Sequence, residues 1–388
     1  MDILKETAVF KEETIALRRQ LHKNPELSGK EFATTELIIK ELEKLGIDYI
    51  RPAETGVIAI IKGEDNGKVL GIRADIDALP VEEETGLEFS SVNHGVMHAC
   101  GHDVHTASLI QTVKILNIHK NKIKGTVKFI FQPSEEFLPS GAEKMVESGE
   151  LNDCSAIVGI HVKSDMPVGK ISVEPGPRMA ASAGVDIKVK GKSGHGGSPS
   201  TAVDATVAAS AIVMNLQTII SRELSLDNMA VLSIGTLNSG TARNVISGEA
   251  VLEGTCRYYS DEAIEHVIEA VERIAQCTAK AFRAEAEVSV VPSGCGAVIN
   301  DSKLAAEGAK TAEKLFGKSA LCHYPISGLN EDFSKYNAIC PLLYVLIGAQ
   351  NDEKFESYPL HSSKLQLDED CMDYAAGFMA QFAIDYFN

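Results

Sequence analysis

The segment Ala156-Ile157-Val158-Gly159-Ile160-His161 decides the fold class, because it is apolar up to its last residue. A short apolar run of this kind is typical of a strand buried on both faces, in the centre of a sheet covered by helices. We expect His161 to be the C-terminal residue of this strand. In open α/β sheets the carboxyl ends of the strands line the ligand crevice, so His161 is a candidate site residue.

Helical and extended patterns alternate on both sides of this strand, which indicates an α/β protein. The predicted helices cover residues 2–22, 31–45, 102–118 and 369–386, and the predicted strands cover 57–61, 69–74, 126–131 and 342–347. The sequence Glu64-Asp65-Asn66-Gly67 predicts a tight hairpin turn between the first two of these strands. The reason is that Asn-Gly tolerates the positive φ of such a turn.

The pattern changes between about residues 181 and 291. Here the predicted order is a strand from 185, a helix at 202–221, strands at 230–236 and 249–258, a helix at 261–282 and a strand at 286–291. This order is that of a ferredoxin-like α+β module. Such a sheet leaves an edge strand and a helix free to pair with a copy of itself. We therefore predict a lid and dimerisation domain at 181–292, inserted into a discontinuous catalytic metal-binding domain at 1–180 and 293–388. The catalytic domain should have a central mixed sheet flanked by helices.

The segment Met97-His98-Ala99-Cys100-Gly101-His102-Asp103-Val104-His105-Thr106 holds one thiol and three imidazoles. Sulfur and imidazole donors together suit a divalent ion such as zinc. Glu135 and Glu136 follow an apolar strand, and His361 lies in a loop near the C-terminus. A metal that activates water and a carboxylate that moves a proton indicate hydrolysis. The alternative is a buried, packing cysteine and a solvated glutamate pair.

Composition narrows the class of protein. The chain has 388 residues, 44% hydrophobic and 23% charged, which suits a globular protein of two domains. A net charge of −17 argues against nucleic acid and anionic membranes as partners.

No apolar run approaches the ~20 residues of a membrane span, and the N-terminus lacks a signal-peptide core. The eight cysteines form no Cys-x-x-Cys pair, so we expect reduced thiols and a cytoplasmic location.

Six motifs in order carry a resemblance to a known family. They are Arg73-Ala74-Asp75-Ile76-Asp77-Ala78-Leu79-Pro80, Met97 to Thr106, Phe131 to Glu136, Gly194-His195-Gly196-Gly197-Ser198-Pro199, Gly240-Thr241-Ala242-Arg243-Asn244-Val245-Ile246 and His361-Ser362. Together they resemble the amidohydrolase branch of the co-catalytic metallopeptidases. That branch contains hippurate hydrolase, bacterial N-acyl-amino-acid amidohydrolases and plant indole-acetyl-amino-acid hydrolases. The resemblance covers essentially the whole chain.

The resemblance implies two divalent ions per subunit, zinc or manganese, with cobalt and nickel as alternatives. The implied ligands are Cys100, His102, Glu136, His161 and His361. Glu135 would be the general base. In the wider family a histidine stands two residues before the strand-end aspartate, and an aspartate bridges the metals; here Arg73 and Cys100 occupy those positions. A thiolate bridge favours softer ions.

Four further residues receive roles. Asp75 would accept a hydrogen bond from a ligand imidazole and fix its tautomer, the alternative being a turn residue. By resemblance, His195 reaches the active site of the partner subunit of a homodimer and polarises the scissile carbonyl. The alternative for His195 is a surface loop without a role. Asn244 would hydrogen-bond the substrate. Arg178 would meet a substrate carboxylate or an interdomain acid.

The expected activity is metal-dependent hydrolysis of N-acyl amino acids, of N-acetyl or N-benzoyl type, to a carboxylate and a free amino acid. The same machinery would serve an N-acetyl-diaminopimelate deacetylase, a dipeptidase or an aminopeptidase. An alternative of another class is a non-catalytic metal- or thiol-binding relative, against which the intact Glu135 argues. Asn330 before Glu331, and Ser363-Lys364-Leu365 after His361-Ser362, depart from the usual branch pattern and leave the acyl preference open.

Overall fold

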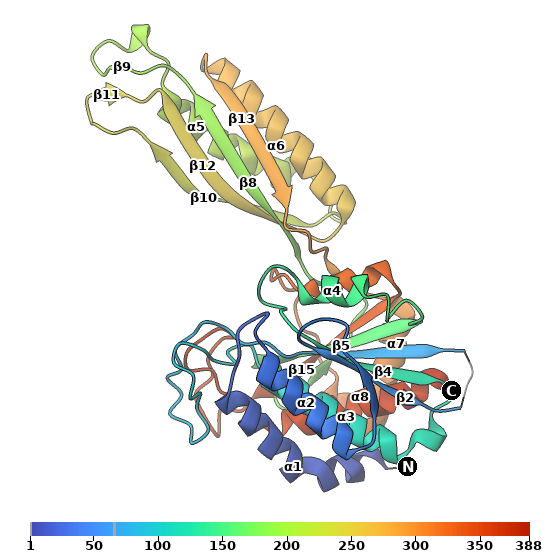
Figure 1. The fold of residues 1–388 in the computed structure, drawn as a ribbon. Coiled ribbons are helices and arrows are strands. Elements are labelled where there is room, and N and C mark those ends of the chain that lie inside the picture. Colours follow the sequence, from blue (N-terminus) through green and yellow to red (C-terminus); the bar gives the residue numbers. More distant parts are fainter. Residues whose placement is uncertain (1, 65–66) are drawn as a thin grey trace. The chain divides into compact units, whose positions relative to one another are not determined.

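The computed structural model describes residues 2–64 and 67–388, which form two compact units (Figure 1). The first unit comprises Met1–Arg178, Ile299–Pro325 and Asp332–Asn388, and the second comprises Met179–Val298 and Ile326–Glu331. The predicted domain boundaries had left residues 326–331 with the catalytic domain. The roles of the units as catalytic and lid domains remain predictions.

A seven-stranded mixed sheet forms the centre of the first unit, in the order β1-β2-β4-β3-β5-β15-β6. Its strands are β1 (Asp48–Ile50), β2 (Val57–Lys62), β3 (Val69–Asp75), β4 (Thr126–Gln132), β5 (Ala156–Pro167), β6 (Ile171–Ser172) and β15 (Leu342–Gln350). The inner strands β4, β3, β5 and β15 run parallel to one another, while the outer pairings are antiparallel. The predicted α/β class with a central mixed sheet is confirmed.

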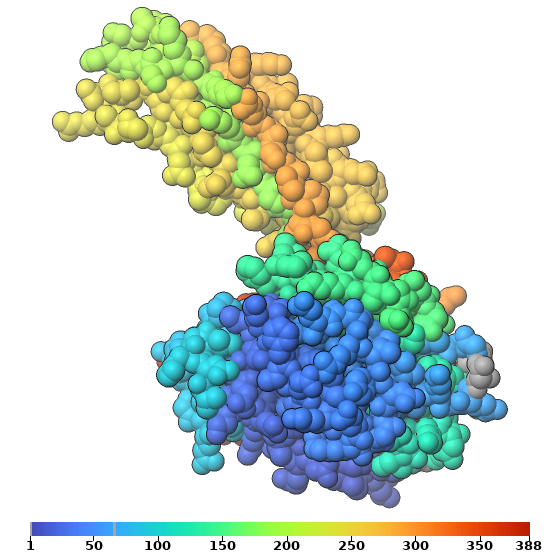
Figure 2. Space-filling view, in the orientation of Figure 1, coloured from blue at the N-terminus to red at the C-terminus, as the bar shows by residue number. Residues whose placement is uncertain are grey.

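Among the described residues, six α-helices pack around this sheet. They are α1 (Ile3–Lys23), α2 (Phe32–Lys44), α3 (His102–Ile118), α4 (Gly141–Glu147), α7 (Ser302–Phe316) and α8 (Cys371–Phe387). Residues 102–116 of α3 are all buried, so this helix is enclosed on every side. The N-terminal residues, blue in Figure 2, cover much of the visible face of the first unit. The candidate metal-binding motif therefore leads into a helix whose position is fixed by packing.

Two expectations about the sheet were wrong. The strands predicted as a hairpin, β2 and β3, do not pair, because β4 lies between them; the turn residues Asp65 and Asn66 lie outside the described residues. Strand β5 does not end at His161 but continues to Pro167, since β15 pairs with it beyond that point. His161 therefore lies within a strand, opposite Leu346.

The second unit is the predicted ferredoxin-like module. Its antiparallel sheet has the order β10-β12-β8-β13, and α5 and α6 cover one face of it (Figure 1). The elements are β8 (Ala181–Lys190), α5 (Ala205–Thr218), β10 (Ala230–Ser239), β12 (Glu249–Tyr258), α6 (Asp261–Ala281) and β13 (Glu285–Pro292). Two short strands, β9 (Gly194–His195) and β11 (Val245–Ile246), pair with each other. Another short pair, β7 (Gly176–Met179) with β14 (Val298–Asn300), is made mostly of residues of the first unit, at two of the points where the chain passes from one unit to the other.

Within the described part of the chain, no helix has the length and apolar character needed to cross a bilayer. All eight cysteines are free thiols.

Candidate metal centre

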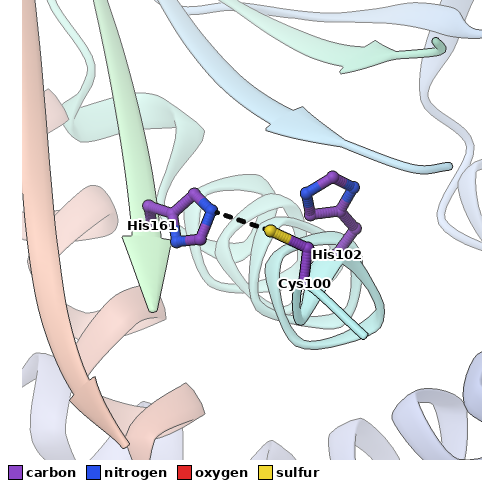
Figure 3. A group of neighbouring side chains, drawn as sticks. All are labelled: Cys100, His102 and His161. Atoms are coloured by element: carbon purple, nitrogen blue, oxygen red, sulfur yellow. Dashed lines mark hydrogen bonds between the residues drawn. The ribbon is translucent and has the colours of Figure 1, made fainter. Parts of the chain in front are cut away.

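A tight turn at Cys100-Gly101-His102 brings two donor side chains to the start of α3. Gly101 has φ +85°, and a Cβ at this position would approach Val162 Cγ2 to 2.6 Å and Leu367 Cδ1 to 2.8 Å. The turn therefore requires glycine. It places the Cys100 and His102 donors within 4.8 Å of each other and of the His161 donor. Figure 3 shows the two imidazoles on opposite sides of the sulfur.

Strand β5 supplies the third member of this group. His161 Nδ1 donates to the Val162 carbonyl oxygen at 2.6 Å, and His161 Nε2 lies 3.4 Å from Cys100 Sγ. Burial, with the His105 and Lys163 side chains nearby, holds the pKa of His161 well below its usual value. The ring is therefore neutral, and its Nε2 lone pair is directed at the thiol.

A second group of donors shares Cys100 with the first. The donor atoms of Cys100, Glu136 and His361 lie within 4.8 Å of one another, and His361 Nε2 is 3.2 Å from Glu136 Oε1. His361 has φ +69°, an unfavourable region for a residue with a Cβ, and its backbone N–H donates to the Ala99 carbonyl at 2.7 Å. Strained backbone of this kind concentrates at functional sites. The loop thus holds His361 against the Cys100 turn.

The loop after β4 carries the glutamate pair. Ser134 N–H donates to Glu31 Oε1 at 2.8 Å, and Glu136 N–H donates to Asp77 Oδ2 at 3.0 Å. Two buried carboxylates therefore fix the path of this loop. Glu135, Glu136 and His102 also place donor atoms within 4.8 Å of one another. Glu135 thus lies beside both donor groups.

Asp77, and not Asp75, holds the ring of His102. His102 Nδ1 lies 3.0 Å from the Asp77 carbonyl oxygen and 3.1 Å from Asp77 Oδ1. The opposite nitrogen, His102 Nε2, is buried and makes no hydrogen bond. The nearest carboxylate oxygens, of Asp75 and Glu136, lie 3.7 and 3.9 Å from this nitrogen. A buried nitrogen without a hydrogen bond is costly, whereas a metal ligand needs one ring nitrogen held by an acceptor and the other left to bind the ion. The ring therefore fits a metal.

Asp77 was not among the predicted site residues, and Asp75 had been predicted to hold a ligand imidazole. The available signal was the repeated acid in Asp75-Ile76-Asp77. Asp75 instead holds His105: its Oδ1 is 2.6 Å from His105 Nδ1. The Val162 N–H donates to His105 Nε2 at 2.9 Å. Because both ring nitrogens of His105 are engaged, His105 positions the strand that carries His161.

Arg73, which takes the place of the histidine usual in the wider family, is also a support. Its Nη1 lies 2.6 Å from Asp75 Oδ2, and its other nitrogens bond to Gln132 and Asp332. Burial alone would raise the pKa of Asp75, but Arg73, His102 and His105 hold it well below its usual range. Asp75 is therefore a carboxylate that anchors His105.

The donor set fits a pair of divalent ions. Burial, together with the Glu136 carboxylate, raises the pKa of the Cys100 thiol, and hydrogen bonds to Cys100 and Glu136 raise the pKa of His361 to about 10. Without a cation these groups therefore hold protons. Metal ligands must give up those protons, so divalent charge is the complement that this group needs.

Comparison with known proteins supports the same interpretation. Residues 71–385 match the peptidase family M20/M25/M40. The chain belongs to this family. It is 41% identical over 377 residues to the N-acetylcysteine deacetylase of Bacillus subtilis (strain 168), covering 97% of each chain. It is also 41% identical over 278 residues to an N-acyl-L-amino acid amidohydrolase of Geobacillus stearothermophilus, covering 71% of this chain and 75% of that one.

Among solved structures, this M20 protein is similar to a Bacillus subtilis protein described as a dinuclear metal-binding peptidase from the M20 family. The TM-score is 0.85 at 39% identity, with 97% of this chain and 98% of that one covered. The predictions of the family and of an amidohydrolase are confirmed.

The structure brings the five predicted ligands and Glu135 together in the first unit of this M20 protein. His195 and Asn244 lie in the second unit, where Gly196 N–H donates to the Asn244 carbonyl at 2.8 Å. Their placement relative to the metal centre remains a prediction. Arg178 is buried against Glu174 and the Tyr324 carbonyl, at 3.1 and 2.8 Å, so its contacts are structural and do not favour a substrate role.

Proposed function

We propose that this chain hydrolyses the amide bond of N-acyl amino acids, of N-acetyl or N-benzoyl type, to a carboxylate and a free amino acid. The observation that carries the proposal is the pair of donor groups that share Cys100, with Glu135 beside them. The names of the two relatives, which describe a deacetylase and an N-acyl-amino-acid amidohydrolase, support this substrate class.

Two divalent ions are the cofactors in this proposal. Cys100, His102 and His161 would hold one, and Cys100, Glu136 and His361 would hold the other. Bound there, the ions would lower the pKa of a nucleophilic water, and their positive charge would polarise the amide carbonyl. Thiolate and imidazole donors favour zinc, cobalt or nickel over manganese.

Glu135 moves the protons. It accepts a proton from the attacking water as the new carbon–oxygen bond forms, and delivers that proton to the amine nitrogen as the carbon–nitrogen bond breaks. Glu136, the next residue, is engaged with His361, so the two carboxylates have separate tasks. Asp77 keeps the proton of His102 on Nδ1, which leaves Nε2 directed at the donor group.

His195 supports the carbonyl oxygen in this proposal. Gly197 N–H donates to His195 Nδ1 at 3.0 Å, so the ring proton resides on Nε2, where it can be donated to an oxyanion. By family resemblance this imidazole serves the site of the partner subunit, in a homodimer formed through the second unit, and Asn244 binds the substrate. The second unit then acts as a lid for a cytoplasmic enzyme.

A hydrolysis screen tests the proposal. Protein stripped with chelator and restored in turn with zinc, manganese, cobalt or nickel is given N-acetyl and N-benzoyl amino acids, N-acetyl-diaminopimelate and dipeptides, and released amine is measured. Metal-dependent release from acyl amino acids supports the proposal. If dipeptides are hydrolysed faster than acyl amino acids, the chain is a peptidase. If folded, metal-loaded protein releases no amine from any compound, a non-catalytic relative is favoured.

A further inference from the structure

A pocket of about 280 Å³ lies in the first unit directly beside Glu136. Five apolar side chains make up most of its wall, and Ser28, Lys30 and Glu136 complete the lining; the apolar residues are Leu27, Ala78, Leu79, Pro80 and Phe137. Cavities of about 150 Å³ with such linings hold a benzene ring. The pocket is therefore large enough for an aromatic ring or a short alkyl chain, and much larger than a methyl group requires.

The floor of the pocket is held by hydrogen bonds on both sides. Ala78 N–H donates to the Glu26 carbonyl at 2.8 Å, while the N–H and carbonyl of Leu79 both pair with Met97 at 3.0 Å. Leu27 and Ala78 form a parallel bridge. A pocket with such a floor is formed before a ligand arrives, so little ordering opposes binding.

The mouth of the pocket exposes unusual apolar surface. Phe137 is 73% exposed and Leu27 is 36% exposed. Exposed aromatic surface next to a concave apolar wall is typical of a binding site. The mouth therefore favours an apolar ligand group.

One carboxylate links this pocket to the metal centre. Asp77 Oδ2 accepts from Ser28 Oγ at 2.6 Å, in the pocket lining, and from the Glu136 N–H at 3.0 Å. Its Oδ1 lies 3.1 Å from His102 Nδ1. The same residue thus holds the pocket wall, the ring of one candidate ligand and the backbone of another.

We propose that this pocket is the specificity subsite for an uncharged apolar group attached next to the scissile amide, larger than a methyl group. The inference rests on the proposed function for the position of the amide. The apolar group can belong to the acyl half or to the amino-acid side chain. Each methylene buried there raises kcat/KM by about fourfold.

Two substrate series and two variants test this subsite. One series lengthens the acyl group from acetyl to hexanoyl and benzoyl on a single amino acid, and the other varies the side chain of N-acetyl amino acids from alanine to leucine and phenylalanine. Leu27→Trp fills the pocket and Phe137→Ala removes part of its wall. Val92→Trp and Leu138→Ala are matched exposed controls outside the lining, at 54% and 62% exposure.

In the unchanged protein and both controls, we expect kcat/KM to rise with group size along one series. In Leu27→Trp the ratio between the largest and the smallest substrate of that series should fall at least about tenfold, and in Phe137→Ala it should fall several-fold. The series that responds identifies the half of the substrate that enters the pocket. Equal effects of Leu27→Trp on all members of both series would overturn the subsite.

Binding separates this inference from the proposed function. Calorimetry with metal-loaded Glu135→Gln and its double variant with Leu27→Trp measures the affinity for the same compounds without turnover. Size-dependent affinity that Leu27→Trp abolishes supports the subsite even if the unchanged protein hydrolyses none of them. Hydrolysis without any size-dependent effect of Leu27→Trp supports the function and rejects the subsite.

Discussion

His102 Nδ1 lies 3.1 Å from Asp77 Oδ1, and this contact connects the start of α3 with the loop after β3. The same aspartate accepts hydrogen bonds from Ser28 and from the backbone of Glu136 through its other oxygen. Burial alone would raise the pKa of Asp77, but the His102 and Ser28 hydrogen bonds keep it below its usual value. A single carboxylate thus orients one candidate ligand and the loop that carries another.

Replacing Asp77 with asparagine should weaken metal binding. The carboxylate that holds the His102 ring is lost while the volume of the side chain stays the same, and losses of this kind cost about 10- to 100-fold in metal affinity. Competition with a fluorescent chelator measures the change. Asp48→Asn, at an exposed position, is the control. Unaltered affinity in Asp77→Asn would show that His102 needs no such support.

His105 should matter for stability and not as a ligand. His105→Ala removes the partner of Asp75 Oδ1 and of the Val162 N–H, although Arg73 still pairs with Asp75 Oδ2, so we expect the free energy of unfolding to fall by about 3 kcal/mol. His105→Gln, which keeps a polar group, should lose less. Urea unfolding gives the stability, and mass spectrometry of the folded fraction gives its metal content.

The comparison with His102→Ala makes this test decisive. Folded His105→Gln should retain the metal content of the unchanged protein, whereas His102→Ala should bind less. Equal metal loss in the two variants would mean that His105 is itself a ligand.

The candidate ligands could be predicted from the sequence, but the residues that hold them in place could not. The Cys100-Gly101-His102 turn, the Glu135-Glu136 pair and His361 are recognisable because thiol, imidazole and carboxylate groups are chemically distinctive. The choice between Asp75 and Asp77 is not, because it depends on how the chain turns after β3. The pocket beside Glu136 was equally hidden, since Leu27 and Leu79 are unremarkable residues far apart in the sequence.

In the fold, likewise, the elements themselves could be predicted from the sequence, but the pairing of the strands could not. Helices such as α6 and strands such as β12 follow from their periodicity, and the predicted bounds agree with the structure to within one residue. The pairing of β2 with β4 does not follow from local sequence, because Asn-Gly signals a turn without specifying which strands it joins. The extension of β5 beyond His161 depends on β15, which comes much later in the chain.

Stability should depend on pH through Glu83, away from the metal centre. Burial alone would raise the pKa of Glu83, but the hydrogen bond to His22 Nε2, at 3.1 Å, and the Ser91 N–H lower it to about 2. Ionised Glu83 therefore contributes fully to the free energy of unfolding above the pKa of the unfolded state, about 4.5. This contribution is lost as the pH falls from there toward 2.

Glu83→Gln should accordingly lower the free energy of unfolding at pH 7 by about 1–2 kcal/mol, and the difference from the unchanged protein should shrink at pH 3.5. Equilibrium unfolding at both pH values measures it. Glu12→Gln, at an exposed position, serves as control. A difference that grows on acidification would contradict the sign of this pKa shift.

His195→Ala should lower kcat by about 10²- to 10³-fold while metal content stays constant, because one donor to the oxyanion is lost. Mixed dimers test whether it acts across subunits. When Glu135→Gln and His195→Ala protomers are co-expressed and pair at random, about half of the dimers are mixed, and one of the two sites in each mixed dimer is complete. Activity should therefore recover to about a quarter of the unchanged level. No recovery in verified mixed dimers would place His195 in its own subunit's site.

The most direct test of the account is the Glu135→Gln variant, assayed for turnover and metal content on the best substrate of the hydrolysis screen. Glu147→Gln, an exposed substitution on α4, is the control. We predict that Glu135→Gln keeps both metals and loses about 10³-fold or more in kcat, within the range of a lost general base. Turnover within tenfold of the unchanged protein, with both metals bound, would contradict the assignment of Glu135 as the proton carrier.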